Sequence, residues 1–364
     1  MNKLESNNIT PGEFTSLLIG SMIGVGILSL PNDLVNVAKQ DSWISAAIGA
    51  VYPLYMVIVA SFLWKKHPQE NILFLSKKYL GKYLGNILNF IFLLYFVLFT
   101  TSVAFGVSLI LETLISNFLS TSKILLIIFF LAAYTSMKGL KLLGRLNQLM
   151  FLYTIFLSFI LAVALLRGTY LNICPILGSG ILNIIKASKN SAFAYGGIEV
   201  LFLIYPYVTD KKRITKSSLL SVIITALIYS WVTFITIYYL GIDIVPKIEW
   251  SVNSVTKTLE IPVINNFRFI FTILWATIIY KTISNHYFIT AFILKDFFKK
   301  IPIKKIIYAL YPLMLYLSLR YKNSADRLNF LNYIIPKYTL FNMIYVALIT
   351  IIIYLKKDNL HEKQ

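Results

Sequence analysis

The stretch that decides the fold lies near the N-terminus and reads GSMIGVGILSLP, from Gly20 to Pro31. It sits inside a long apolar run, yet glycine costs about 1 kcal/mol and proline about 3 kcal/mol in a helix interior relative to alanine. We therefore expect the helix to unwind near residues 24–26 and to restart inside the membrane. The restarted helix presents free amides and a positive dipole end, which bind anions. The alternative is close helix packing, because Gly20 and Gly24 also form a GxxxG pair.

A second glycine pair interrupts another apolar run near the middle of the chain. Residues 191–199 read SAFAYGGIE, so the carboxylate of Glu199 follows two residues after the pair Gly196–Gly197. Gly24 and Gly196 are separated by close to half the chain. Interrupted spans at corresponding positions of two halves indicate a transporter-type binding site. Each break falls in the first of five spans, which predicts a five-plus-five inverted repeat.

Composition extends this interpretation to the whole chain. Hydrophobic residues make up 58% and charged residues 13% of the sequence, whereas soluble domains carry about 25% charged residues. The apolar runs are apolar on every face and long enough for helices, so a β-barrel is excluded. We predict an all-α integral membrane protein with about ten transmembrane helices. The predicted spans are residues 12–38, 43–64, 84–112, 123–137, 148–167, 181–208, 217–241, 263–294, 303–320 and 337–355.

These spans form one transmembrane domain. Residues 1–355 are assigned to it, with a first repeat at 12–167, a second at 181–320 and the tenth span at 337–355; residues 356–364 are a short cytoplasmic tail. The net charge of +19 is spread over alternate short connections, which by the positive-inside rule places both termini in the cytoplasm. The same spread argues against a nucleic-acid partner. The polar first ten residues lead us to expect no cleavable signal peptide.

Residue types that bind metals or perform catalysis are sparse. The chain has one cysteine, Cys174, and three histidines that are far apart in sequence, His67, His286 and His361. No cluster has metal-ligand spacing and no nucleophile motif lies within the spans. We therefore expect no enzyme activity, no catalytic residues, no metal and no cofactor. His286 has two interpretations, a residue of helix packing or a proton carrier.

The two breaks together predict the chemistry of the ligand. The amides at the first break suit a carboxylate, and the carbonyls left free near Phe193 to Tyr195 suit an ammonium. A zwitterionic amino acid satisfies both ends without a charged side chain. The predicted substrate-binding residues are Gly24, Val25, Gly26, Phe193, Tyr195 and Gly196.

Glu199 and Lys281 are ionisable residues deep within predicted spans. A lone charge there costs about 3 kcal/mol unless it has a partner or lines a wet cavity. We predict that Glu199 is the partner of Lys281. Glu199 is otherwise a proton site or a structural hydrogen-bonding carboxylate. Thr282 and Ser284 are either ligands of a coupling cation or polar contacts between helices.

Other acidic residues have local explanations. The sequence TPGE at residues 10–13 predicts a capping box, with Thr10 before the helix, Pro11 in its first position and Glu13 reaching back. We interpret Glu13 as a cap in preference to a transport carboxylate. Asp33 and Glu112 lie near the outer ends of their spans, where we expect them to be solvated.

Three motifs carry a family resemblance: TPGE at 10–13, GVGILSLP at 24–31 and YGGIEVLFLIYPY at 195–207. With these motifs the chain resembles the spore germination permease family, the B subunits of Ger-type nutrient germinant receptors in the amino acid–polyamine–organocation (APC) superfamily. The resemblance covers essentially the whole chain and implies a LeuT-like fold. It places the pocket at Gly24, Val25, Gly26, Tyr195 and Gly196, closed by the third and eighth spans. We place Tyr95 of the third span and Lys281 of the eighth facing that pocket. Lys281 matches no motif of the family, so the resemblance assigns it no role.

The resemblance also implies a role. A nutrient, often an amino acid, would bind the permease-like pocket in the spore inner membrane, and the signal would pass to the A and C subunits of the receptor. The alternative is a secondary amino acid transporter coupled to a cation. Both have the same fold, and fold alone does not decide function.

Overall fold

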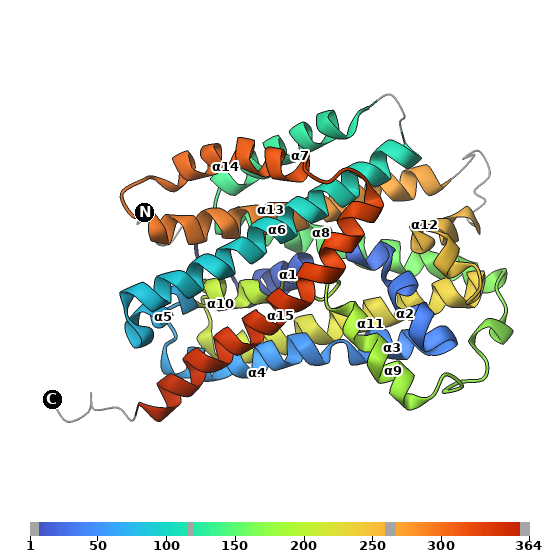
Figure 1. Ribbon diagram of the computed structural model, residues 1–364, viewed down its shortest axis with the longest axis horizontal. Coiled ribbons are helices and arrows are strands. Elements are labelled where there is room, and N and C mark those ends of the chain that lie inside the picture. Colours follow the sequence, from blue (N-terminus) through green and yellow to red (C-terminus); the bar gives the residue numbers. More distant parts are fainter. Residues whose placement is uncertain (1–6, 116–118, 259–266, 357–364) are drawn as a thin grey trace.

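The computed structural model describes residues 7–115, 119–258 and 267–356, which form a bundle of helices (Figure 1). The long helices run along one axis of the bundle, with α5 at one end and α2, α9 and α12 at the other. The helices are α1 (Pro11–Met22), α2 (Leu30–Ala38), α3 (Ser42–Ile48), α4 (Val51–Lys66), α5 (Ile72–Leu80), α6 (Lys82–Leu114), α7 (Thr121–Met137), α8 (Leu140–Ile160), α9 (Ile181–Ser188), α10 (Leu201–Ile204), α11 (Ile214–Leu240), α12 (Ser251–Val255), α13 (Phe267–Phe297), α14 (Ile303–Ser318) and α15 (Ser324–Leu355).

Six helical segments are long and apolar enough to cross a membrane, judged by length and composition. The other predicted spans are present as shorter or divided helices: α7 has 17 residues and α14 has 16. The segment Leu30–Lys66 holds the second part of the first predicted span and all of the second. The chain turns between them at Lys39, whose φ is +47°. The predicted first and sixth spans are both divided, as the glycine pairs indicated. Each of the ten predicted spans therefore has a helical counterpart.

The start of α1 follows from its capping residues. The Thr10 hydroxyl accepts a hydrogen bond from the Glu13 amide at 3.2 Å, and the Glu13 carboxylate accepts one from the Thr10 amide at 2.7 Å. This confirms the predicted capping box, which satisfies two amides that the helix leaves free. The same carboxylate pairs with the Lys141 ammonium at 2.7 Å, so the cap also fastens α1 to α8.

The tenth span begins earlier than the sequence suggested. Helix α15 starts at Ser324, where the Asn323 side chain caps it by accepting from the Asp326 amide at 2.8 Å. The prediction of 337 was too late because residues 322–327 are polar and were assigned to a loop. The added turns bring Arg327 into the protein interior, where it is 2% exposed.

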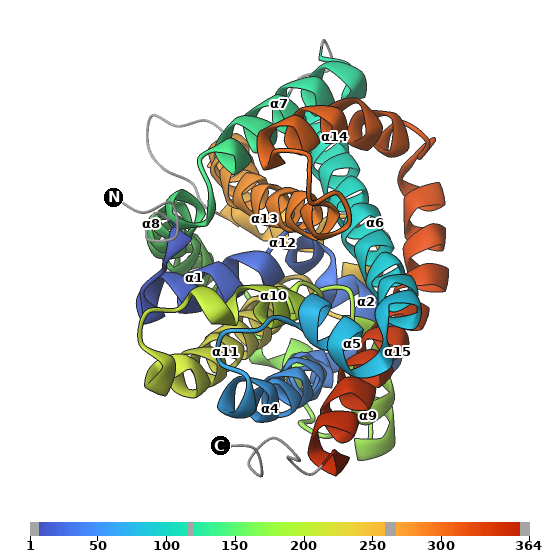
Figure 2. The same ribbon diagram turned by 90° about the vertical axis from the view of Figure 1, so that its left-hand side faces the viewer.

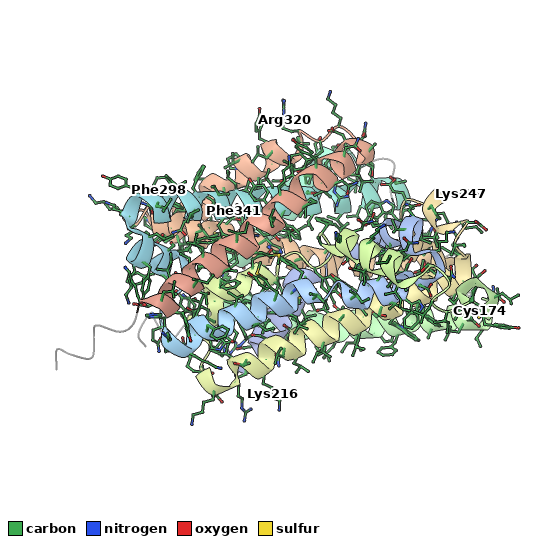
Figure 3. The ribbon with its side chains drawn as sticks, turned by 60° about the horizontal axis from the view of Figure 1, so that its bottom comes forward. Cys174, Lys216, Lys247, Phe298, Arg320 and Phe341 are labelled. Carbon is green, nitrogen blue, oxygen red and sulfur yellow. The ribbon has the colours of Figure 1, made fainter. Side chains whose placement is uncertain are left out.

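The divided helices lie in the middle of the bundle. Viewed along the bundle, α1 and α10 lie side by side between α11 and α13 (Figure 2). Many large apolar side chains instead face outward, among them Phe130, Leu152 and Tyr354, each more than 60% exposed. Such a surface suits the hydrocarbon core of a membrane. Figure 3 shows Phe298 at one end of the bundle and Cys174 and Lys247 at the other.

Candidate functional site

The first helix break has the form that the glycines predicted. Helix α1 ends at Met22 and α2 begins at Leu30, with only a short 3₁₀ turn at Gly26–Leu28 between them. Within the described part of the chain, the backbone amides of residues 24–26 donate no hydrogen bond to another residue. Three consecutive amides at the start of a restarted helix are suited to binding an anion.

The second break packs directly against the first. Helix α9 ends at Ser188 and a 3₁₀ turn continues it over Lys189–Ser191. The chain becomes helical again at the 3₁₀ turn Ile198–Val200 that leads into α10. Gly197 has a φ of +106°, and a Cβ added there would lie 2.2 Å from the Ser21 carbonyl oxygen. A Cβ on Gly26 would lie 3.2 Å from the Cα of Ala194. Glycine is therefore required for the two breaks to touch.

The carbonyls at the end of α1 are satisfied by side chains from two other helices. The Thr282 hydroxyl donates to the carbonyls of Gly20 and Ile23, at 2.8 Å each. Three more side chains contact the carbonyls of residues 21–23. His286 Nε2 lies 3.0 Å from Ser21 O, and the Tyr229 hydroxyl donates to Met22 O at 2.9 Å. Lys281 Nζ donates to Ile23 O at 3.3 Å. Helices α11 and α13 thus hold the end of the broken helix in place.

Some of the carbonyls expected to bind an ammonium already have partners. The Phe193 carbonyl accepts from the Gly196 amide at 3.2 Å, and the Ala194 carbonyl accepts from the Tyr229 hydroxyl at 2.6 Å. The Tyr195 carbonyl accepts no hydrogen bond from another described residue. The Tyr195 hydroxyl donates to Ala46 O at 2.7 Å. Of these three carbonyls, that of Tyr195 is therefore the one left free to accept from a ligand among the described residues.

Glu199 is completely buried and accepts three hydrogen bonds. They come from the Tyr52 hydroxyl, from Asn342 Nδ2 at 3.2 Å and from the Gly197 amide at 2.8 Å. The predicted partnership with Lys281 is wrong, since no ion pair joins these two side chains in the described residues. Neutral donors satisfy the carboxylate, while the Lys281 amine reaches the end of α1 instead.

Of the remaining predicted polar residues, two lie at the breaks and one does not. The Tyr95 hydroxyl accepts from the Gly197 amide at 3.2 Å, which puts α6 against the second break. Thr282 lies at the first break, as described above. The Ser284 hydroxyl donates to the carbonyl of Tyr280 in its own helix at 3.0 Å, which is a local contact within α13.

A cavity of about 320 Å³ reaches both breaks from the side of α2, α9 and α15. Ser29 lines it beside the first break and Phe193 beside the second, with Asp33 opposite. The guanidinium of Arg327 lies 5.7 Å from the centre of the Phe193 ring, and its Nε donates to Ser102 O at 2.8 Å. The sequence interpretation missed Arg327 and treated Asp33 as merely solvated. The capping residue Asn323 is the signal that could have drawn Arg327 into the tenth span.

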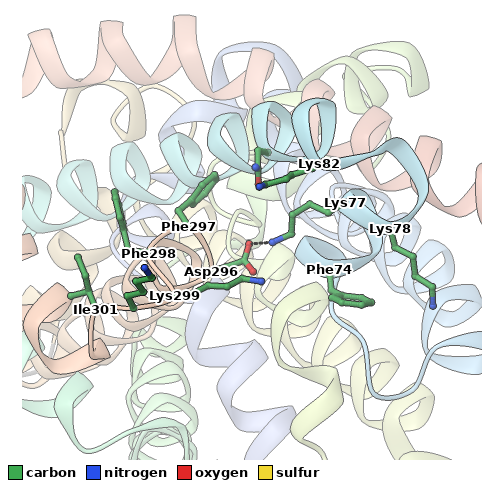
Figure 4. A pocket seen from close by; sticks show the side chains of 11 residues that line it. Phe74, Lys77, Lys78, Lys82, Asp296, Phe297, Phe298, Lys299 and Ile301 are labelled. Atoms are coloured by element: carbon green, nitrogen blue, oxygen red, sulfur yellow. Dashed lines mark hydrogen bonds and ion pairs between the residues drawn. The ribbon is translucent and has the colours of Figure 1, made fainter.

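A larger cavity lies elsewhere, between α5 and the end of α13 (Figure 4). It measures about 750 Å³ and is lined by five lysines and one acidic residue, Asp296. The Lys77 ammonium pairs with this carboxylate. None of the predicted site residues lines this cavity, so its size does not make it the candidate site.

A comparison with protein families shows which family the chain belongs to. A family model described as "Spore germination protein", that of the spore permeases, matches residues 8–327. The chain belongs to this family. The resemblance inferred from the three motifs is thereby confirmed, and the match covers both breaks and most of the bundle.

The relatives of this spore germination permease have low sequence identity, but their alignments cover most of the chain. Spore germination protein YndE of Bacillus subtilis (strain 168) is 22% identical over 88% of this chain and 89% of its own length. Spore germination protein GerQB of Bacillus cereus is 23% identical over 76% of each chain. The similarity therefore extends along nearly the whole protein.

Solved structures show the same fold. Mhp1, a nucleobase-cation-symport-1 family transporter solved in a closed conformation with bromovinylhydantoin, aligns with a TM-score of 0.69 over 95% of this chain and 80% of its own, at 13% identity. MhsT in complex with L-phenylalanine aligns with a TM-score of 0.67 over 94% and 88%, at 16% identity. The all-helical, LeuT-type transporter fold predicted for this spore permease is confirmed. Its family and structural neighbours are permeases and transporters, not enzymes.

Proposed function

We propose that this chain is the B subunit of a germinant receptor and binds an amino acid at its two helix breaks. The observation that carries the proposal is the row of amides at residues 24–26, which have no partner in the described chain. Gly26, the last of this row, packs against Phe193 and Ala194 at the second break. The ligand carboxylate accepts from these amides. Its ammonium donates to the Tyr195 carbonyl, so that a zwitterion is held without a charged side chain.

The cavity beside the breaks gives the ligand its route to this site. Phe193 lies between the cavity and the breaks, with its ring 5.3 Å from that of Phe99 on α6. Asp33, Lys189 and Arg327 line this cavity, so its walls carry charges of both signs, which suits a zwitterion. Binding at the breaks changes how α1 and α10 pack on each other, and this change is the signal that passes to the A and C subunits. In this proposal the protein lies in the spore inner membrane with both termini in the cytoplasm.

The competing function is cation-coupled amino acid transport, which the fold shared with transporters favours. Uptake of the ligand into proteoliposomes containing only this chain separates the two functions. A receptor subunit gives saturable binding without concentrative uptake. Accumulation of the ligand against its gradient would establish the transporter instead.

A screen of the common amino acids by thermal shift on the purified protein tests the binding site. At least one amino acid is expected to raise the unfolding midpoint, because it binds the folded state alone. Its carboxamide is expected to bind roughly 10- to 100-fold more weakly, since charge-assisted hydrogen bonds contribute about 1.5–3 kcal/mol. Equal affinity of the acid and the carboxamide would show that the amides of residues 24–26 do not hold the carboxylate.

Gly24→Leu tests the same site from the protein side. A Cβ at this position lies 3.2 Å from Thr282 Cγ2, so the rest of the leucine must occupy the break. We expect the variant to insert into the membrane but to lose the ligand-induced thermal shift. Gly12→Leu is the matched control, because it adds the same side chain to the exposed first turn of α1, 3.6 Å from its nearest neighbour. A normal shift in Gly24→Leu would leave Gly24 as a packing residue.

A further inference from the structure

Lys281 has an unusual environment for a lysine. It lies in the middle of α13 and is 1% exposed. Its amine makes one hydrogen bond, to the carbonyl oxygen of Ile23 at 3.3 Å, and no carboxylate of the described residues lies within ion-pair distance. A buried cation without a counter-charge is costly, so something else must stabilise it.

The end of α1 supplies the stabilisation. The C-terminal end of a helix carries about half a negative charge, and α1 ends inside the bundle at Met22. The amine of Lys281 approaches this end, with its Cε only 3.1 Å from where a Cβ on Gly20 would be. The lysine side chain therefore lies across the last turn of α1, with its charge at the negative pole of the helix.

The oxygen atoms at this point resemble a site for an inorganic cation. The carbonyls of Gly20 and Ile23 converge on the Thr282 hydroxyl, at 2.8 Å each. Carbonyl and hydroxyl oxygens are the ligands that hard cations prefer. In transporters with broken helices, the carbonyls and C-terminal end of a half-helix coordinate the coupling Na⁺. Here the Lys281 amine already binds one of these carbonyls.

We propose that the Lys281 ammonium is a tethered cation that takes the place of a bound monovalent metal ion at the end of α1. The protein therefore holds α1 against α13 without Na⁺ or K⁺. Removing the amine leaves the same oxygens for an inorganic cation to occupy. The proposal concerns this cation position alone and does not depend on which ligand binds at the breaks.

Thermal unfolding of purified Lys281→Ala in NaCl, KCl or choline chloride at equal ionic strength tests the proposal. Wild-type protein is expected to unfold at the same temperature in all three salts. Lys281→Ala is expected to unfold several degrees lower in choline chloride, and Na⁺ or K⁺ should recover most of the loss with a saturable dose dependence. Adding Thr282→Val to Lys281→Ala is expected to remove the recovery, because it deletes one of the converging oxygens.

Lys295→Ala is the matched control. Lys295 lies on the same helix and its amine also donates to backbone carbonyls, those of Lys299 and Ile301, but it is remote from α1. Its midpoint should show no preference for Na⁺ or K⁺ over choline.

Two results overturn the proposal. One is a wild-type protein that is stabilised by Na⁺ or K⁺ relative to choline, because the metal position would then be open. The other is a folded Lys281→Ala that responds to neither ion. Lys281→Met, which keeps most of the side-chain volume, serves if the alanine variant does not fold. If neither variant folds, the wild-type comparison decides: equal midpoints in the three salts support the proposal, and a metal-ion preference overturns it.

Discussion

Gly197→Ala is expected to destabilise the protein by more than 4 kcal/mol and to abolish ligand binding. The added Cβ would lie 2.2 Å from the Ser21 carbonyl oxygen, a backbone atom at the end of α1 that cannot move alone. An alanine at a φ of +106° adds about 1–2 kcal/mol of backbone strain. Losses above roughly 4 kcal/mol are exceptional and reflect a specific structural conflict of this kind.

Gly180→Ala separates the two contributions. Gly180 also has a positive φ, of +82°, but a Cβ there meets nothing within 4 Å. This variant should therefore show only the backbone strain, with a small fall in the unfolding midpoint and normal ligand binding. The measurement is the thermal unfolding midpoint of both variants in the same detergent, with and without the amino acid found in the screen. An equal fall in the two midpoints would mean that the contact between the breaks is not tight.

In the proposed receptor, this contact is the means by which a small ligand would affect the whole bundle. Gly197 follows the second break and touches α1, while its amide donates to Glu199 and to Tyr95 on α6. Residues of α1, of α6 and of the divided sixth span thus meet at the peptide unit of Gly197. A ligand bound beside it can bias the packing of all three only if it binds one arrangement better than the other.

The divided helices could be predicted from sequence because glycine and proline have large local costs in a helix. The ten spans could be predicted because hydropathy depends on composition. The partners of buried polar groups could not. Tyr52 and Asn342 come from the second and tenth spans and reach Glu199 only in the folded bundle. Lys281 was predicted as the partner of Glu199 from its charge alone. That prediction failed because no sequence pattern indicates which side of a fully apolar helix faces which neighbour.

Arg327 shows the same limit at the end of a helix. Its charge and the polar residues around it are typical of a loop. Hydropathy therefore placed the start of the tenth span at residue 337. The structure instead continues α15 to Ser324 and buries the guanidinium against Phe193. Hydropathy averages over a window and cannot distinguish a solvated arginine from one that lines a cavity between helices.

Glu199→Ala and Glu199→Gln are expected to differ sharply in stability. Alanine leaves two buried donors without an acceptor, the Tyr52 hydroxyl and Asn342 Nδ2. The Gly197 amide loses its shorter hydrogen bond and keeps only the one to the Tyr95 hydroxyl. Each unsatisfied donor costs about 1–3 kcal/mol, so a total loss of roughly 2–6 kcal/mol is expected for the two donors. The loss should appear as a large fall in the unfolding midpoint and a loss of the ligand-induced shift, because Glu199 fixes the amide of Gly197 at the second break.

Glutamine should recover most of this loss, because its neighbours can rearrange. Its oxygen can accept from the Gly197 amide, and its NH₂ group can donate to the Tyr52 hydroxyl oxygen and to Asn342 Oδ1, a buried atom with no partner among the described residues. Turning the Asn342 amide is enough to make this contact. We therefore expect Glu199→Gln to unfold within about 1 kcal/mol of wild type. Since glutamine cannot carry a charge, a stable variant that no longer responds to the ligand would assign a proton role to Glu199. A fall as large as that of alanine would instead contradict this hydrogen-bond network.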